Sequence, residues 1–204
     1  MDVPVIFDRK AVRLHRERAA KTQRATTPIL EAAADILLDR LDDVMRSFSN
    51  ALDIGGRGII CQGLNRRKIP AITCDLSEAQ ARCASTPSVC ADEERLPFAP
   101  SSFDLVVASL SLHWVNDLPG LFHQIRSILR PDGLFLASIP ILPTLRPLRQ
   151  ALEMAELALS DGVSPAYHPC PHSKAVSRYC SVQDLRYLWW IQKHWSCVTA
   201  PYTH

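Results

Sequence analysis

The sequence lacks an excess of charge of either sign. Its 204 residues include 23 lysines and arginines against 21 aspartates and glutamates, which gives a formal net charge of +2. Because positive and negative charges are nearly balanced, the chain as a whole is not attracted to nucleic acid or to an anionic membrane surface. We therefore expect a local site to select the partners of this protein, and we predict no nucleic-acid partner.

Long apolar runs and paired cysteines are also missing. No run approaches the ~18 residues that a membrane-spanning helix needs, and the opening residues MDVP show no secretory pattern. The seven cysteines are an odd number without Cys-x-x-Cys spacing, which favours reduced thiols. These absences predict a soluble protein without a membrane span in a cytosol-like compartment.

Apolar residues make up 47% of the chain, which is enough for one domain-sized core. From Ala51 onward, short apolar runs alternate with helical or loop segments. The runs that we predict to be strands are 51–54, 70–74, 88–91, 103–108 and 134–139. This alternation predicts an α/β fold, with a Rossmann-like, doubly wound, mostly parallel sheet that helices cover on both faces.

Helices are predicted on either side of these strands. Residues 9–24 mix basic and apolar side chains, and we interpret them as a mostly solvated surface helix. A nucleic-acid site is disfavoured there because aromatic residues are absent. Apolar residues recur at helical spacing from Leu30 to Leu41, and further helices are predicted at 117–130 and 145–159.

The chain divides into three parts by composition. Residues 1–50 form an N-terminal helical part, 51–160 the α/β domain and 161–204 an irregular tail with a possible short helix at 182–193. The cluster His168-Pro-Cys-Pro-His172 lacks a second pair of ligands at zinc-like spacing, so we predict no metal. We expect the tail after about Pro169 to be dispensable for ligand binding.

Three glycines follow the first predicted strand. Gly55, Gly56 and Gly58 stand where a strand would turn into a helix, just after Asp53. Glycine at such a turn lets the backbone approach a ligand, and the helix N terminus beyond it offers free N–H groups. Taken alone, the same pattern also fits a turn that is tight for geometric reasons.

Acidic residues follow the second and third predicted strands. Asp75 lies about 20 residues beyond the glycines, where doubly wound folds hold a pair of ribose hydroxyls, although Asp75 or Ser77 could instead cap the next helix. Asp92 could accept a hydrogen bond from an adenine amino group. A solvated acidic loop is the alternative, and it suits Glu93 or Glu94 better than Asp92.

The order of the motifs ALDIGGRG, CDLS, ADEERLPF, FDLVVASLSLHWVNDL and LRPDGLFLAS resembles the class I S-adenosylmethionine-dependent methyltransferases. Within that superfamily the chain is similar to the malonyl-carrier-protein methyltransferases of biotin synthesis and to the arginine-hydroxylating assembly factors of mitochondrial complex I. The segment IFDR at 6–9 and the string SLSLHWVNDL favour the assembly-factor side. The resemblance runs from about residue 5 to about residue 169.

The resemblance implies S-adenosylmethionine as the cofactor and assigns residues to it. Gly55, Gly56 and Gly58 would line its methionine part, Asp75 would hold the ribose, Asp92 with Glu93 would face the adenine, Asp53 would support the glycine loop, and Ser109 with Leu110 would lie near the sulfonium. His113 follows the fourth strand and could serve as a general base. We favour a packing or cofactor-covering role for it.

The chain also departs from the family pattern. The family's acid-x-Gly-x-Gly-x-Gly motif is one residue shorter here, so the loop must close differently or shift in register. Prolines crowd the segment 139–147, where they remove N–H donors near the expected acceptor. The last strands of the superfamily have no candidate sequence, so either the sheet ends early or the C terminus is altered.

Three functions are compatible with these observations. The first is transfer of a methyl group from S-adenosylmethionine to a protein or small-molecule acceptor. The second is hydroxylation of a protein arginine, or an assembly role, with a respiratory complex I subunit as the candidate partner. The third is a non-catalytic, truncated family member. The expected location is the cytoplasm for a bacterial source or the mitochondrial matrix for a eukaryotic one.

Overall fold

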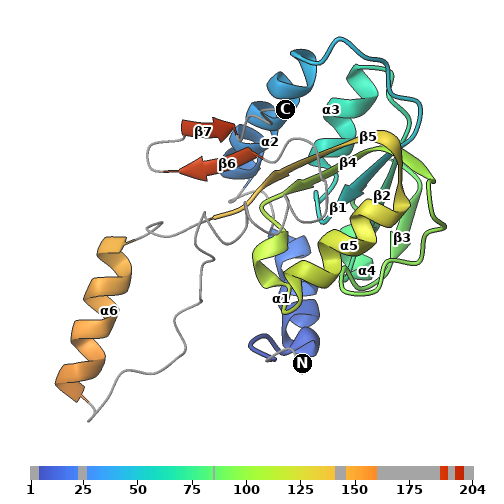
Figure 1. Ribbon diagram of the computed structural model, residues 1–204. Helices are drawn as coiled ribbons and strands as arrows, with labels where there is room; N and C mark the ends of the chain where they lie inside the picture. The colour runs from blue at the N-terminus through green and yellow to red at the C-terminus, as the bar shows by residue number, and fades with distance from the viewer. Residues whose placement is uncertain are drawn as a thin grey trace.

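The computed structural model describes residues 5–22, 27–84, 86–140, 146–159, 189–192 and 196–199. Figure 1 shows the arrangement of the elements in these ranges. In chain order they are α1 (Arg9–Thr22), α2 (Thr27–Asp42), β1 (Ala51–Ile54), α3 (Ile59–Arg66), β2 (Ala71–Asp75), α4 (Glu78–Ala81), β3 (Ser88–Cys90), β4 (Phe103–Ser109), the 3-10 helix η2 (Leu112–Trp114), α5 (Leu118–Ile128), β5 (Leu129–Ser138), α6 (Arg146–Leu159), β6 (Trp189–Gln192) and β7 (Ser196–Thr199).

The main sheet has five strands in the order β3-β2-β1-β4-β5, and every neighbouring pair is parallel. The chain builds outward from β1 in one direction through β2 and β3, then crosses to β4 and β5 on the other side. This reversal creates a switch point between β1 and β4, the place where ligands bind in open α/β sheets. The doubly wound parallel sheet predicted from the sequence is confirmed.

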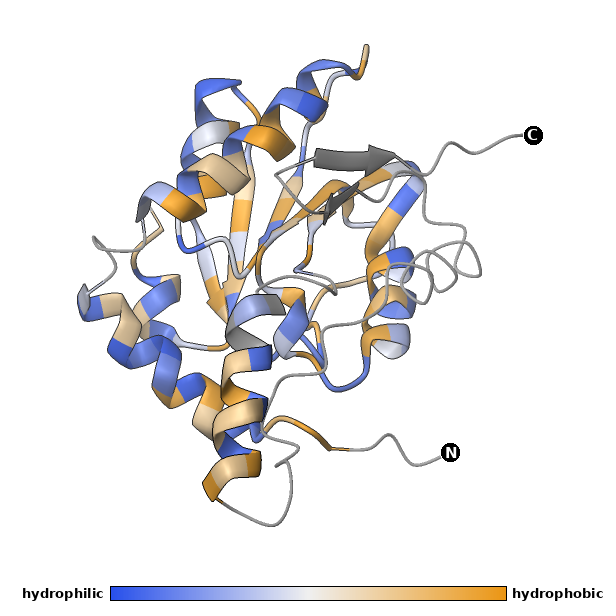
Figure 2. Ribbon diagram, turned by 90° about the vertical axis from the view of Figure 1, so that its left-hand side faces the viewer, coloured by the Kyte–Doolittle hydropathy of each residue, from blue (hydrophilic) through white to orange (hydrophobic). Residues whose placement is uncertain are grey.

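Helices cover both faces of this sheet, each over its own apolar cluster. On one face α2 and α3 pack on β1, β4 and β5, and the buried side chains include Leu37, Leu64, Ala51, Leu105 and Leu136. On the other face α5 packs on the same strands, with Phe122, Ile125, Leu52, Val106 and Phe135 among the buried side chains. Figure 2 shows the strands as mostly hydrophobic between helices with hydrophilic outer sides. Strands buried on both faces explain the unbroken apolar runs in the sequence.

Several predicted boundaries are corrected by the structure. Helix α5 ends at Ile128, and β5 begins at Leu129 rather than after a turn at 131–133, because Leu129 pairs with Phe103 of β4. A register shift between Phe103 and Leu105 accommodates this longer strand.

The C-terminal part contains a strand pair where we predicted none. The possible helix at 182–193 is wrong for 189–192, which form β6 and pair antiparallel with β7. The run WWIQ is rich in aromatic and β-branched residues, which favour strands. The rest of 161–204 lies outside the described residues, including the cluster 168–172 and the tail that we expect to be dispensable, as do residues 141–145 of the proline-rich segment.

Asp117 caps the helix that follows the SLSLHWVND string. Its Oδ1 accepts a hydrogen bond of 2.8 Å from the backbone N–H of Gly120, at the first turn of α5. We expect Asp117→Ala to lower the free energy of unfolding by about 1 kcal/mol in urea denaturation. Asp117→Asn should retain most of the stability, since asparagine caps equally well. An equal loss in both variants would show that the charge, and not the hydrogen bond, stabilises α5.

Within the described ranges, none of the helices is both long and apolar enough to cross a membrane.

Candidate functional site

The topology brings the predicted site residues to one edge of the sheet. The glycine loop follows β1, Asp75 ends β2, Asp92 and Glu93 come directly after β3, and Ser109 ends β4. The carboxyl ends of parallel strands share an edge, so these residues meet at the switch point although they span 57 positions from Asp53 to Leu110. The structure thus gathers the residues that the motifs singled out.

The shortened glycine loop closes through left-handed backbone conformations. Gly55 has φ +66° and Gly58 has φ +81°, and Arg57 between them has φ +51°. Only glycine adopts such angles without cost, so the arginine marks strain that the shorter loop imposes. A Cβ atom on Gly55 would lie 2.6 Å from Cβ of Ser111 and 3.8 Å from Oδ2 of Asp75. The backbone of Gly55 therefore lies against the site itself.

Asp53 supports the loop from beneath. It is fully buried, and a Cβ atom on Gly56 would collide with its carboxylate. The Cys61 thiol donates to Oδ2 of Asp53 at 3.3 Å, whereas Oδ1 has no hydrogen-bond partner among the described residues. Burial raises the pKa of Asp53 to about 7. Burial therefore favours the protonated form of the carboxyl group beneath the loop.

Helix α1 supplies cations to the acidic residues of the site. Nη1 of Arg16 donates to Oδ1 of Asp75 at 3.3 Å and also to Oε1 of Glu93. Nη2 of Arg9 donates to Oδ1 of Asp92 at 2.6 Å and to Oε2 of Glu93. The side chain of Arg16 is only 7% exposed, and that of Glu93 is fully buried.

One sequence interpretation is wrong at this point and another is confirmed only in part. The helix predicted at 9–24 is mostly exposed as expected, but its inner face buries Val12 and Arg16. Glu93 does not belong to a solvated acidic loop, because arginines from α1 enclose its carboxylate. A signal existed in the sequence: Arg9 and Arg16 are seven residues apart and so fall on one helix face, together with Val12.

The ionisation of the acidic residues follows from their surroundings. Burial raises the pKa of Asp75, and the charge of Arg16 and the backbone N–H of Ser77 oppose that rise. Burial alone would also raise the pKa of Asp92, but the hydrogen bonds from Arg9 and from the N–H of Glu94, together with the charges of Arg9 and Arg16, outweigh it and hold this pKa below its usual value. Ser77 also caps α4 by accepting from the N–H of Gln80, so the capping interpretation holds alongside the site.

A cavity of about 510 Å³ lies between α1 and the glycine loop, within the size range of small-molecule sites. Apolar and polar side chains share its lining, which includes Phe7, Val12, Arg16, Arg57, Gln80 and Trp114. Three buried atoms in this region have no hydrogen-bond partner among the described residues, namely Nη2 of Arg16, Oδ2 of Asp75 and Oε1 of Gln80. One donor and two acceptors left open predict a ligand with hydroxyl-like groups.

The end of β4 forms another wall of the site. Ser109 is buried, with its Oγ 3.4 Å from Oγ of Ser138, and Leu110 adopts a left-handed φ of +47°. The rings of His113 and Trp114 lie 5.1 Å apart, and Phe7 meets Trp114 edge to face at 5.7 Å. This stacking supports the packing role for His113. Its action as a general base stays a prediction.

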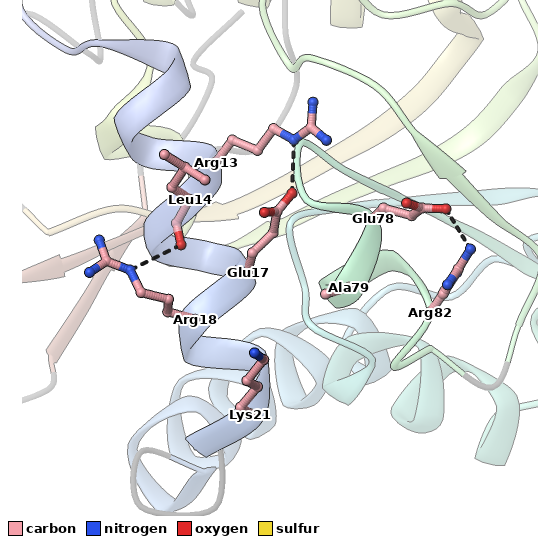
Figure 3. Close-up of a pocket in the computed structure, with 8 residues that line it drawn as sticks. All are labelled: Arg13, Leu14, Glu17, Arg18, Lys21, Glu78, Ala79 and Arg82. Atoms are coloured by element: carbon pink, nitrogen blue, oxygen red, sulfur yellow. Dashed lines mark hydrogen bonds and ion pairs between the residues drawn. The ribbon is translucent and has the colours of Figure 1, made fainter.

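A second cavity, of about 760 Å³, lies between α1 and α4 (Figure 3). Four of its charged residues form ion pairs with near neighbours in the chain, Arg13 with Glu17 at 2.8 Å and Arg82 with Glu78 at 2.6 Å. The residues predicted for the site line neither cavity. The cavity of about 510 Å³ is lined by Arg16, which bonds to Asp75 and Glu93, and by Arg57 of the glycine loop, so we place the candidate site beside it. Among the residues described, no three His, Cys, Asp or Glu side chains are grouped to hold a metal ion.

Comparison with known proteins finds a family model. Residues 52–137 match the model described as "Methyltransferase domain". The chain is similar to the human mitochondrial arginine-hydroxylase NDUFAF5, with 41% identity over 192 residues that cover 90% of this chain and 53% of that protein. It is 32% identical to the malonyl-[acyl-carrier protein] O-methyltransferase of Methylovorus sp., over 72% of this chain and 55% of the relative. The chain thus spans about half the length of these relatives.

Solved structures share the fold. The YcgJ protein of Bacillus subtilis matches with a TM-score of 0.59 and 20% identity, over 79% of this chain and 70% of that one. A phosphoethanolamine N-methyltransferase of Haemonchus contortus, solved with S-adenosylhomocysteine, matches with a TM-score of 0.57 and 16% identity, over 74% of this chain and 36% of that one.

Proposed function

Because the chain belongs to the class I S-adenosylmethionine-dependent methyltransferase superfamily, we propose that it binds S-adenosylmethionine along the carboxyl edge of the sheet. In this proposal Gly55, Gly56 and Gly58 cradle the methionine part, Asp75 holds the ribose, Asp92 and Glu93 face the adenine, and Ser109 and Leu110 lie near the sulfonium. Asp53 supports the loop beneath. The cofactor would lie across the carboxyl ends of β1, β2 and β4 and the segment after β3.

One observation carries this proposal, the open oxygen of Asp75. Its Oδ1 is occupied by Arg16 and by the N–H of Ser77 at 2.8 Å, whereas Oδ2 is buried without a partner. Oδ2 lies on the side of Gly55, since a Cβ atom added to that glycine would lie 3.8 Å from it. A buried carboxylate oxygen without a donor is costly unless a ligand supplies one. The hydroxyls of a ribose are such donors.

We further propose methyl transfer as the reaction class. When bound, S-adenosylmethionine supplies an electrophilic methyl group on a sulfonium. The contribution of this chain would be alignment and exclusion of water, because Arg57 of the glycine loop and Gln80 of α4 line the cavity opposite α1, which covers it. Phe7 and Trp114 would pack the covering side.

Titration calorimetry with S-adenosylmethionine tests the proposal directly. We expect saturable binding of one cofactor per chain, with S-adenosylhomocysteine as a competitor. A titration without heat at any accessible concentration would contradict the proposal and favour the third interpretation, a non-catalytic member of the superfamily.

Asp75→Ala is expected to weaken S-adenosylmethionine binding by on the order of 1.5–3 kcal/mol, because it removes a charged acceptor from two ribose hydroxyls. Asp92→Ala offers a comparison at the adenine end, where Arg9 already pairs with the carboxylate and the loss should be smaller. Unchanged affinity of the Asp75 variant in the calorimeter would remove this residue from the site.

Arginine hydroxylation is the second candidate function, and the 41% identity to a protein named as an arginine-hydroxylase favours it. The acceptor would then be a protein, with a respiratory complex I subunit as the candidate partner and the mitochondrial matrix as the location in a eukaryotic source. For a bacterial source the cytoplasm is the proposed location. Mass spectrometry of an acceptor protein separates the two reactions, since one adds an oxygen atom and the other a CH₂ group.

A further inference from the structure

The inner face of α1 is part of the wall around the candidate site. Arg16 reaches from this helix to Asp75 at the end of β2 and to Glu93 after β3. Gln80 of α4 donates to the backbone carbonyl of Arg16 at 3.2 Å, which fixes the helix at this residue. One buried guanidinium thus joins two carboxylates that belong to different segments of the domain.

We propose that Arg16 is a positioning residue of the cofactor site, which orients Asp75 and Glu93 for the adenosine part, so that docking of α1 and cofactor binding form one equilibrium. This inference rests on the proposed function. The family motifs do not include Arg16, since the N-terminal segment IFDR ends at Arg9 and the next motif begins at β1.

The geometry distinguishes a positioning role from a blocking one. Arg16 contacts Oδ1 of Asp75, the same oxygen that accepts from the N–H of Ser77. The two donors therefore fix the carboxylate in one orientation and leave Oδ2 directed to the glycine loop. An arginine that replaced the ribose would have to cover Oδ2. Arg16 leaves that atom open and adds its own free Nη2 as a donor.

If Arg16 positions Asp75 by its charge, removal of Arg16 should make cofactor affinity depend on pH. The titratable and charged groups that face Asp75 are Arg16 on α1, Arg57 in the glycine loop, Glu93 after β3, Asp53 on β1, Cys74 on β2 and Cys90 on β3. Without the charge of Arg16, burial and Glu93 would both raise the pKa of Asp75 further. In a variant without Arg16, Glu93 would still pair with Arg9. Asp75 is therefore the carboxylate that would lose its cationic partner. The acceptor for the ribose would then keep its proton to a higher pH than in the wild type.

The test is calorimetric titration of the full chain with S-adenosylmethionine at several pH values. We expect Arg16→Gln to bind roughly 10–100-fold more weakly than the wild type near pH 6.5. The difference should shrink as the pH is raised and Asp75 ionises. Arg16→Lys keeps a charge and should recover most of the affinity with a flat pH profile. Arg13→Gln is the matched control, because Arg13 lies on the outer side of α1 and pairs with Glu17 (Figure 3).

Each result supports or contradicts the positioning role of Arg16. Equal or tighter binding by Arg16→Gln would overturn the role of Arg16, as would a loss that is the same at every pH and is not recovered by lysine. If Arg16→Gln unfolds, the comparison of Arg16→Lys with Arg13→Gln still decides, since a tenfold loss in the lysine variant that does not vary with pH contradicts positioning by charge. A wild type that binds no cofactor would contradict the proposed function itself.

Discussion

Gly56→Ala is expected to lower the free energy of unfolding by on the order of 3 kcal/mol and to remove measurable binding of S-adenosylmethionine. The added methyl group would meet the carboxylate of Asp53, which is fully buried and cannot move into solvent. Either the loop or β1 must shift, and both form the proposed cradle for the methionine part. Urea denaturation and calorimetry on the same preparation measure the two effects.

The cost at Gly56 is one of space, because a left-handed φ occurs at Gly55 and Gly58 and not at Gly56. A double-mutant cycle with Asp53→Ala therefore provides the control. Without the carboxylate the methyl group has room, so Gly56→Ala should cost far less in that background. Additive effects would show that the backbone of the loop, and not the contact with Asp53, requires glycine.

Local pattern was enough to predict the scaffold of the site. The apolar runs predicted all five strands of the main sheet, because strands covered on both faces leave an unbroken apolar signal. The acids at the strand ends, such as Asp75 and Asp92, could then be placed on one edge, because parallel topology brings strand ends together. Their roles toward the cofactor remain proposals.

The contacts of α1 could not be predicted in the same way. Arg16 meets Asp75 across 59 positions and Glu93 across 77. A charged residue buried through a distant partner leaves the same local pattern as a solvated one, so the sequence favoured a surface helix. The same reason explains Glu93, whose burial depends on two arginines from α1.

The loss of one residue from the glycine motif is also understood only with the structure. The shorter loop closes because Arg57 takes a left-handed φ of +51°, and its Nη2 donates to the carbonyl of Leu110 at 3.4 Å. This hydrogen bond links the loop to the end of β4. The shortened motif is therefore compatible with a formed site, which the sequence alone left open.

Asp53→Asn is expected to stabilise the protein at neutral pH by roughly 4 kcal/mol, since each unit of pKa shift corresponds to about 1.4 kcal/mol. Burial raises the pKa of Asp53 to about 7 in the folded chain, from an ordinary value of 3.8. Asparagine has nearly the same shape and no charge to desolvate. Chemical denaturation at neutral pH should show the gain.

The dependence on pH identifies the cause. Below pH 3.8 the carboxyl group is protonated in both states, and Asp53 is not penalised. Between that value and about 7 the folded chain retains a proton that the unfolded chain has lost, so stability falls as pH rises. Above about 7 the penalty is complete and constant. The difference between Asp53→Asn and the wild type should therefore grow from about pH 4 to about pH 7 and then level off.

Asp104 provides a control of opposite sign. Burial would raise its pKa, but hydrogen bonds from Ser49 and Asn50 outweigh burial and lower it. Its contribution to stability is thus present at neutral pH and is lost as pH falls, so Asp104→Asn should destabilise the protein at pH 7 and approach the wild type in acid. A gain for Asp53→Asn that does not vary with pH would show that packing, and not the ionisation of a buried acid beneath the glycine loop, limits the stability of this edge.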